Sequence, residues 1–189
     1  MQPEGETDWR GVLAAIEDAV KILPVPVIVK EVGAGIQAPL AVRLFDVGVS
    51  LVDVAGLGGT NWARIEAARR PDGSVAAFEP FLDRGIPTLE CLLQAAQVCP
   101  DKSLIASGGV RHGLDAAKAL RAGASMVSLA GPMLKALSGT QSGILEPERL
   151  AAMIDDWCGQ MALALFLTGS ADIAAFRRCA GVVNTPGQS

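Results

Sequence analysis

Hydrophobic residues along the chain alternate between short unbroken apolar runs and stretches with helical spacing. The apolar runs predict four strands, at residues 25–30, 49–54, 103–106 and 125–129. The first of these, VPVIVK, is typical of a strand buried on both faces. Helical spacing predicts helices at residues 9–22, 39–47, 61–70, 88–98, 113–122, 132–137, 147–167 and 171–178, with Asp8 as the N-cap of the first. This alternation indicates an α/β protein with a parallel sheet.

The last two predicted strands both end at small residues that lead into a helix. These corners are Ser107-Gly108-Gly109 and Ala130-Gly131. Small residues let backbone N–H groups approach an anion, and a helix N-terminus favours negative charge. Barrels of the (β/α)₈ type bind phosphate after their last two strands. Four strands cannot close such a barrel, so the chain is either half a barrel or a small open sheet.

Chemically useful side chains also follow the first two strands. Lys30 ends the first strand, where a cation can stabilise negative charge on a cofactor or substrate. Glu31 either pairs with a base such as Lys30 or has a functional role. Thr60 either contacts a ligand or caps the next helix, for which Asn61 would also serve. Trp62 is interpreted as a core residue, with stacking on a ligand as the alternative.

Composition narrows the function classes. The net charge is −4, which gives no electrostatic reason to expect nucleic acid or a membrane surface as a partner. The four cysteines are far apart and form no CxxC motif, which argues against zinc and favours reduced thiols in the cytoplasm. The acidic start is unlike a secretory signal, and the longest apolar run is too short to span a bilayer. His112 is interpreted as an exposed side chain, and no catalytic or metal-binding residue is assigned.

Several sequence blocks together resemble the type 2 isopentenyl-diphosphate isomerases, which are FMN-dependent enzymes. The blocks are VIVKEVGAGI, DVAGLGGTNWARIEAAR, GIPT, LIASGGVRHGLDAAKALRAGA and LAGPML. QPEGETDWRG, near the start, is also similar to the family. The resemblance implies an α/β fold of the (β/α)₈ TIM-barrel family, with this chain supplying the C-terminal half-barrel, strands 5–8 with their helices. Residues 1–137 would form that half, 138–180 would be helices packing on it, and 181–189 a tail.

The resemblance also implies a set of FMN contacts. Lys30 would contact the flavin ring, where a cation can stabilise negative charge near N1 of the reduced flavin. Ala55 and Thr60 would also touch FMN. The residues that would bind the FMN phosphate are Gly109, Val110, Arg111, Ala130 and Gly131.

The family isomerises isopentenyl diphosphate to dimethylallyl diphosphate in isoprenoid biosynthesis, with reduced FMN, Mg²⁺ and NADPH as reductant. Its catalytic histidine and glutamine and its Mg²⁺-binding glutamate precede the part that this chain resembles, and neither His112 nor Gln2 matches them. We therefore expect this chain to be a truncated product or a fragment that is inactive alone.

Two alternatives stay open: a half-barrel module that binds FMN or phosphate, and an FMN-dependent oxidoreductase of another substrate class. The full-length form would take a small diphosphate substrate. For the chain itself we expect a homo-oligomer, because a half-barrel would bury its open edges against another copy, and a cytoplasmic location.

Overall fold

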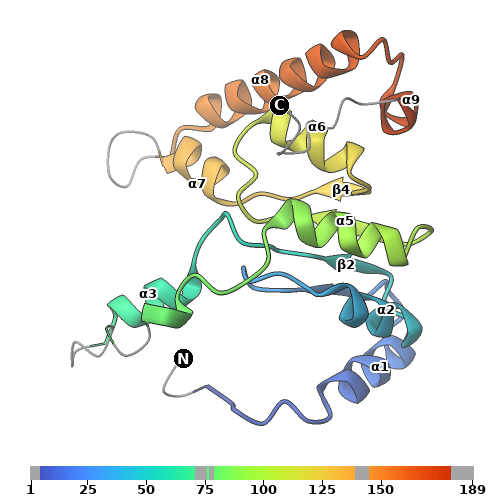
Figure 1. Ribbon diagram of the computed structural model, residues 1–189. Coiled ribbons are helices and arrows are strands. Elements are labelled where there is room, and N and C mark those ends of the chain that lie inside the picture. Colours follow the sequence, from blue (N-terminus) through green and yellow to red (C-terminus); the bar gives the residue numbers. More distant parts are fainter. Residues whose placement is uncertain (1–4, 71–75, 77–78, 139–144, 180–189) are drawn as a thin grey trace, which may run out of the picture.

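Parallel strands in chain order form the framework of the protein. The computed structural model describes residues 5–70, 76, 79–138 and 145–179. The strands are β1 (Ile28–Lys30), β2 (Leu51–Asp53), β3 (Ser103–Ala106) and β4 (Met126–Val127), paired in the order β1-β2-β3-β4. The helices are α1 (Val12–Ile22), α2 (Ala38–Asp46), α3 (Trp62–Ala68), the 3-10 helix η1 (Glu79–Phe81), α5 (Thr88–Val98), α6 (Gly113–Arg121), α7 (Gly131–Ser138), α8 (Pro147–Leu167) and α9 (Ile173–Arg178) (Figure 1).

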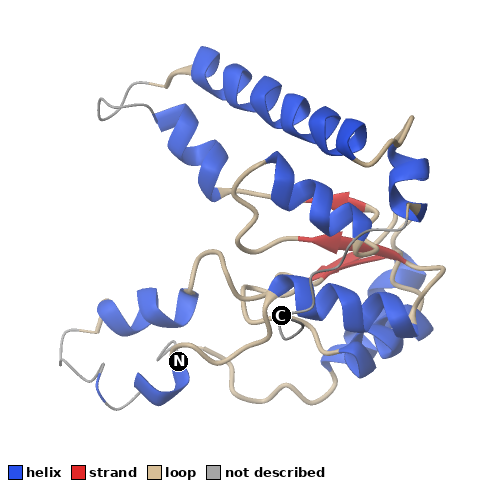
Figure 2. Cartoon of the chain, turned by 45° about the horizontal axis from the view of Figure 1, so that its top comes forward, coloured by secondary structure: helices blue, strands red, loops and turns tan. Residues whose placement is uncertain are grey.

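One face of the sheet packs against helices and forms the core. Val52 and Val54 from the β2 segment and Leu104 and Ala106 from β3 are fully buried in one cluster with residues of α2 and α5. Alternate residues of a strand point to the same face, so these four side chains share the helical side. Figure 2 shows the strands side by side, with helices above and below them.

The other face of the sheet is open at its two edge strands, β1 and β4. Ile28 of β1 is 52% exposed and Met126 of β4 is 47% exposed, and neither belongs to the core cluster. The prediction that the first strand is buried on both faces is therefore wrong. In β1 the middle residue, Val29, is half-buried, while the residues on either side are exposed. A face that is apolar but uncovered is what half of a barrel leaves open, because in a closed barrel the opposite strands fill the interior.

The predicted elements are present, but several boundaries differ. The second strand covers Leu51–Asp53 rather than 49–54, and the fourth covers Met126–Val127 rather than 125–129. The first helix begins at Val12 after Gly11, so Asp8 is not its N-cap. The Asp8 carboxylate accepts hydrogen bonds from the backbone and guanidinium of Arg10 instead. The predicted excursion at 71–81, the linker at 138–143 and the tail at 181–189 lie largely or wholly outside the described residues.

The long helix α8 is the outermost layer beyond β4, with α6 and α7 between them (Figure 1). An 18-residue window of this 21-residue helix has a mean hydropathy of 1.3, so by length and composition alone the helix could cross a membrane. It is the one such helix in the described part of the chain. The expectation from the sequence considered only the shorter unbroken apolar run at the end of this helix. Asp155 and Asp156 lie near its middle, where carboxylates are costly in hydrocarbon. Because α8 packs against α6 and α7, we interpret it as a helix of this fold.

Candidate functional site

Lys30 and Asp53 lie side by side where β1 and β2 end. The parallel register pairs them, and both face the open side of the sheet. The Lys30 ammonium is exposed and donates a hydrogen bond to the carbonyl oxygen of Glu31 at 2.6 Å. The structure therefore puts this predicted cation at the rim, within reach of a ligand above the strand ends.

The Glu31 carboxylate is held by backbone amides. Its Oε2 accepts hydrogen bonds from the N–H groups of Gly33 and Ala34, both at 2.5 Å, and of Gly35 at 3.0 Å. Pairing of this carboxylate with Lys30 is therefore wrong, since Lys30 bonds the carbonyl of Glu31 and not its side chain. Three donors on one oxygen fix the turn after β1, which makes Glu31 the residue that shapes the loop beside Lys30.

Asp53 is a buried carboxylate that joins the ends of β2 and β3. It is 3% exposed, and its Oδ1 accepts hydrogen bonds from the Ser107 hydroxyl at 2.6 Å and from the Ala55 N–H at 3.1 Å. Burying a carboxylate is costly unless donors replace its water. Ala55 has a φ of 38°, a left-handed value that is uncommon for a residue with a Cβ. Asp53 therefore holds Ala55, a predicted FMN contact, in its unusual conformation.

Thr60 is exposed on the rim and does not cap α3. Asn61 takes that role, because its side-chain oxygen accepts the N–H of Arg64 at 3.0 Å. The carbonyl oxygen of Thr60 lies against Gly33, where an added Cβ would be 2.9 Å away. The loops after β1 and β2 thus touch, and the Thr60 hydroxyl stays available. Trp62 is 53% exposed, so its assignment to the core is wrong.

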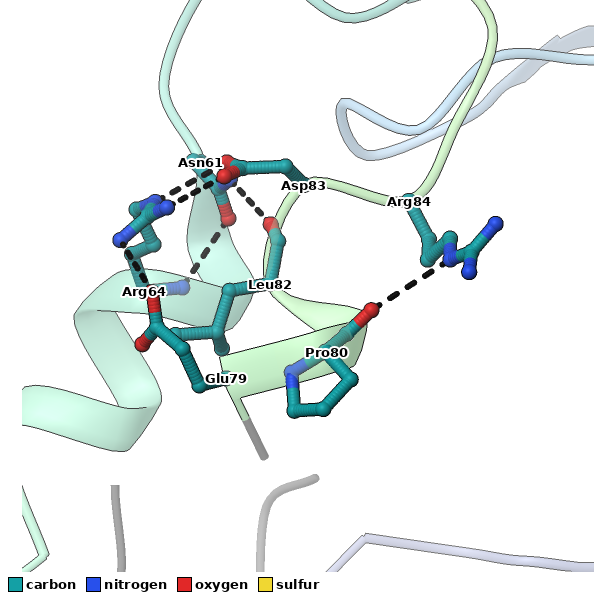
Figure 3. A network of polar contacts seen from close by, with 7 residues as sticks. All are labelled: Asn61, Arg64, Glu79, Pro80, Leu82, Asp83 and Arg84. Carbon is teal, nitrogen blue, oxygen red and sulfur yellow. Dashed lines mark hydrogen bonds and ion pairs between the residues drawn. The ribbon is translucent and has the colours of Figure 1, made fainter. Parts of the chain in front are cut away.

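A polar network joins the start of α3 to the segment after η1 (Figure 3). The Asn61 amide donates to the carbonyl of Leu82 at 2.5 Å, and Arg64 Nε donates to Asp83 Oδ1 at 3.0 Å. Arg64 also lies 3.7 Å from Glu79. The hydrogen bond from Arg64 lowers the pKa of the Asp83 carboxyl below its ordinary value. Arg84 points away from this network and donates to the carbonyl of Pro80 (Figure 3).

The corner after β3 offers backbone donors. Gly109 follows Gly108, and both have positive φ, 76° and 91°. Within the described residues the N–H groups of Gly109 and Val110 have no acceptor. A Cβ added to Gly59 would lie 2.9 Å from the Gly109 nitrogen, so the missing side chain leaves space beside this donor. Such a cradle, lined by amides, suits an anion.

The start of α6 is already capped and is not itself an anion site. The Gly113 N–H donates to Gln160 of α8 at 2.7 Å, and the Asp115 N–H donates to Nδ1 of His112 at 3.2 Å. The Arg111 N–H donates to the Asp115 carboxylate at 3.1 Å. His112 is therefore a helix cap, not a free exposed side chain. The Arg111 guanidinium stays exposed at the rim, 3.6 Å from Asp115.

The corner after β4 leads into the start of α7. The Leu134 N–H donates a hydrogen bond to the carbonyl of Ala130 at 2.9 Å and so closes the first turn of this helix. The amides of Gly131 and Met133 precede it and have no acceptor among the described residues, as is usual in the first turn of a helix. The predicted phosphate residues thus bring two sets of unpaired donors to the same edge of the sheet.

No metal cluster accompanies these donors. In the described segments, no group of three or more His, Cys, Asp or Glu side chains could hold a metal ion. All four cysteines are free, and burial raises the pKa of the Cys91 and Cys99 thiols. Neither thiol is a nucleophile poised at neutral pH, because a raised pKa keeps sulfur protonated.

A family model covers nearly the whole chain. The model described as FMN-dependent dehydrogenase matches residues 2–180. The chain belongs to the FMN-dependent dehydrogenase family. It spans about half the length of the curated relatives that it matches.

Those relatives are named as isomerases. The chain is 48% identical over 179 residues to an isopentenyl-diphosphate delta-isomerase of Stutzerimonas stutzeri, covering 94% of this chain and 50% of the relative. It is 46% identical to the proteins of that name from Xanthobacter autotrophicus and Synechococcus, with the same coverage. The predicted family resemblance is thereby confirmed.

Solved structures confirm the fold. A protein described as a lactate oxidase of Pediococcus acidilactici superposes with a TM-score of 0.64 at 22% identity, covering 89% of this chain and 39% of that one. A mandelate oxidase superposes with a TM-score of 0.63 at 21% identity, covering 88% and 42%. The parallel sheet is thus part of the barrel on which this family of FMN-dependent proteins is built.

The residues present fit the cofactor of the family. The amides of Gly109, Val110 and Gly131 have no acceptor in the described part of the chain, and the cradle left by Gly59 adjoins the first of them, which suits an anionic phosphate. Lys30 supplies a cation at the same rim. The eight predicted FMN contacts stay predictions at the level of single residues.

Sequence reasoning missed two residues that shape this rim, Asp53 and Thr88, and it treated Ser107 only as a small residue of the corner after the third strand. Their signals were present. Asp53 is a charged residue at the end of an otherwise apolar strand, and Thr88 ends the GIPT block. What the sequence did not reveal is that these side chains bond across loops 19 to 54 residues apart.

Proposed function

We propose that this chain is the FMN-binding half of an isomerase that converts isopentenyl diphosphate to dimethylallyl diphosphate. The observation that carries the proposal is the 43–48% identity to proteins named for this activity, over at least 92% of this chain. Unpaired amides at two corners and a lysine at a third strand end support the FMN-binding part.

Each half would have a separate task. Bound reduced FMN would supply an electron-rich group for proton transfer at the alkene. In this chain, Gly109, Val110 and Gly131 would hold the FMN phosphate through their amides. Lys30 would lie at the ring and stabilise its negative charge, while Glu31 keeps the adjoining turn rigid. The carboxylates of Glu31 and Asp53 at this rim are occupied by hydrogen bonds from the chain itself, so the half that the relatives have in addition would supply the acid–base groups.

Complementation tests the proposal. The purified chain is titrated with FMN and assayed for isomerisation, alone and with the half of the Stutzerimonas stutzeri relative that it does not match. We expect FMN binding, no turnover by the chain alone, and turnover when both halves and reduced FMN are present. Turnover by the chain alone would show that it carries its own catalytic groups. Failure to bind FMN in either form would overturn the proposal.

A variant of Lys30 tests the contact with the flavin ring separately. Lys30→Met keeps the length of the side chain but removes the charge, so we expect bound flavin to become harder to reduce and its potential to fall. Lys102→Met is the matched control, because Lys102 precedes β3 at the opposite end of the strands. A potential unchanged in Lys30→Met would remove this residue from the flavin site.

For the complete enzyme we further propose NADPH as the reductant of FMN and Mg²⁺ as the ion that neutralises the diphosphate of the substrate. Mg²⁺ commonly binds through one or two carboxylates together with substrate phosphates. Its ligands would lie in the other half, given that the described residues form no metal cluster. We also propose a cytoplasmic location, which the four free cysteines support, and a role in isoprenoid biosynthesis, in which the proposed conversion is a step. We propose no nucleic acid or membrane partner.

A further inference from the structure

Thr88 joins the two glycine loops that flank the phosphate corner. Its backbone N–H donates to the carbonyl of Leu57, in the loop after β2, at 3.3 Å. Its hydroxyl lies 2.6 Å from the carbonyl oxygen of Gly108 and 2.9 Å from that of Ser107, in the loop after β3. One residue at the start of α5 therefore bonds one loop with its backbone and the other with its side chain.

The three segments are joined by further backbone hydrogen bonds. The Gly56 N–H donates to the carbonyl of Ser107 at 3.1 Å, and the Leu57 N–H donates to that of Ile86 at 2.9 Å. The loops also meet without side chains between them, since a Cβ on Gly109 would lie 2.6 Å from the carbonyl of Gly58. Thr88 lies at the centre of this junction.

The Gly108 carbonyl belongs to the same peptide group as the Gly109 N–H. A trans peptide is planar, so its oxygen and its hydrogen point in opposite directions. Fixing the oxygen on Thr88 therefore fixes the direction of the Gly109 N–H. Both flanking residues are glycines with positive φ, and glycine backbones rotate at little steric cost. Without the hydroxyl, this peptide would turn over easily and point the amide away from the cradle beside Gly59.

We infer that Thr88 is a positioning residue, whose hydroxyl holds the Gly108–Gly109 peptide so that the Gly109 amide faces a phosphate group. The inference rests on the proposed FMN site and specifies which contact recognises the phosphate end of the cofactor. Thr88 itself would not touch FMN, and its contribution would be to recognition of phosphate rather than of the flavin ring.

The test compares FMN with riboflavin, which has the same ring but no phosphate. Thr88→Val removes the hydroxyl and keeps the shape of the side chain. We expect it to weaken FMN binding about tenfold, the scale of one lost hydrogen bond, and to leave riboflavin binding unchanged. Thr88→Ser restores the hydroxyl and should restore the preference for FMN. Thr168→Val, which removes a hydroxyl bonded to carbonyls at the end of α8, is the matched control.

Hydrogen exchange of the free chain separates this inference from the proposed function. In Thr88→Val the amides of Gly56 and Leu57 should exchange faster than in wild type, while those of α8 stay unchanged. An equal loss of FMN and riboflavin binding, or unchanged exchange at the junction, would overturn the positioning role. If the wild-type chain binds neither flavin, the proposed function fails, and the exchange measurement still decides whether Thr88 holds the loops.

Discussion

The absence of a side chain at Gly59 keeps the amide of Gly109 open. An added methyl group would lie 2.9 Å from that nitrogen and 3.2 Å from the Cα of Gly108. Gly59 does not have a positive φ, so an alanine there meets a steric obstacle rather than backbone strain. A substitution at Gly59 therefore tests whether a ligand needs the space beside the Gly109 amide.

Gly59→Ala should lower the affinity for FMN by roughly 10- to 100-fold, the range expected for losing a hydrogen bond to a charged group. Titration followed by flavin fluorescence measures the change. Gly159→Ala in α8 is the matched control, because nothing lies within 4 Å of a Cβ at that position. Equal affinities for Gly59→Ala and wild type would mean that phosphate does not occupy the cradle.

At the scale of elements, α8 is attached to the rest of the molecule through the start of α6. Gln160 accepts the Gly113 N–H at 2.7 Å, and a Cβ on Gly113 would lie 2.8 Å from the Cβ of Gln160. Arg177 of α9 adds a second tie by donating to the carbonyl of Ala124 at 2.5 Å. The helices α8 and α9 thus hold the start of α6 and the segment just after its end by hydrogen bonds.

Gln160→Ala should lower the free energy of unfolding by about 1 kcal/mol, because it leaves a helix N-terminal amide without its acceptor. Urea denaturation followed by circular dichroism measures the loss. Gln94→Ala is the control, since its amide bonds only the exposed Glu90 side chain one turn away. A smaller effect at Gln160 than at Gln94 would contradict the bracing role of this contact.

Local patterns predicted the order and type of the elements because apolar runs and helical spacing record which residues face the core. They failed where neighbours in space decide the outcome. The β1 residues are apolar enough for a strand buried on both faces, yet one face of this chain is left open. Trp62 has helical spacing but extends from the rim. The role of Thr88 depends on carbonyls from two distant loops, which no local pattern encodes.

At the scale of the whole molecule, the open face and the two free sheet edges govern association. β1 and β4 each have a neighbour on one side, and the exposed Ile28 and Met126 lie on the uncovered face. Unpaired parallel edges with apolar surface beside them favour pairing with another chain. The proposal of a homo-oligomer draws its support from this surface.

The isolated chain should therefore self-associate with rising concentration, as measured by light scattering after size-exclusion chromatography. Ile28→Lys places a charge on the open face and should shift the equilibrium toward monomer. Val98→Lys, at the exposed end of α5 outside that face, is the control and should leave association unchanged. A chain that stays monomeric at every concentration would contradict the prediction.

The described strands lie in the sheet in the same order as in the chain, and this order matters while the protein is being synthesised. Each strand pairs with the strand made just before it, so every unit can dock on a finished neighbour as it leaves the ribosome. Each pairing closes only the crossover between two consecutive strands. Of the four described strands, β4, with two paired residues, is the last to be made. The corner at Ala130 and Gly131 therefore leaves the ribosome after the corner at Gly109, and the two corners of the candidate phosphate site come together only once β4 has paired with β3.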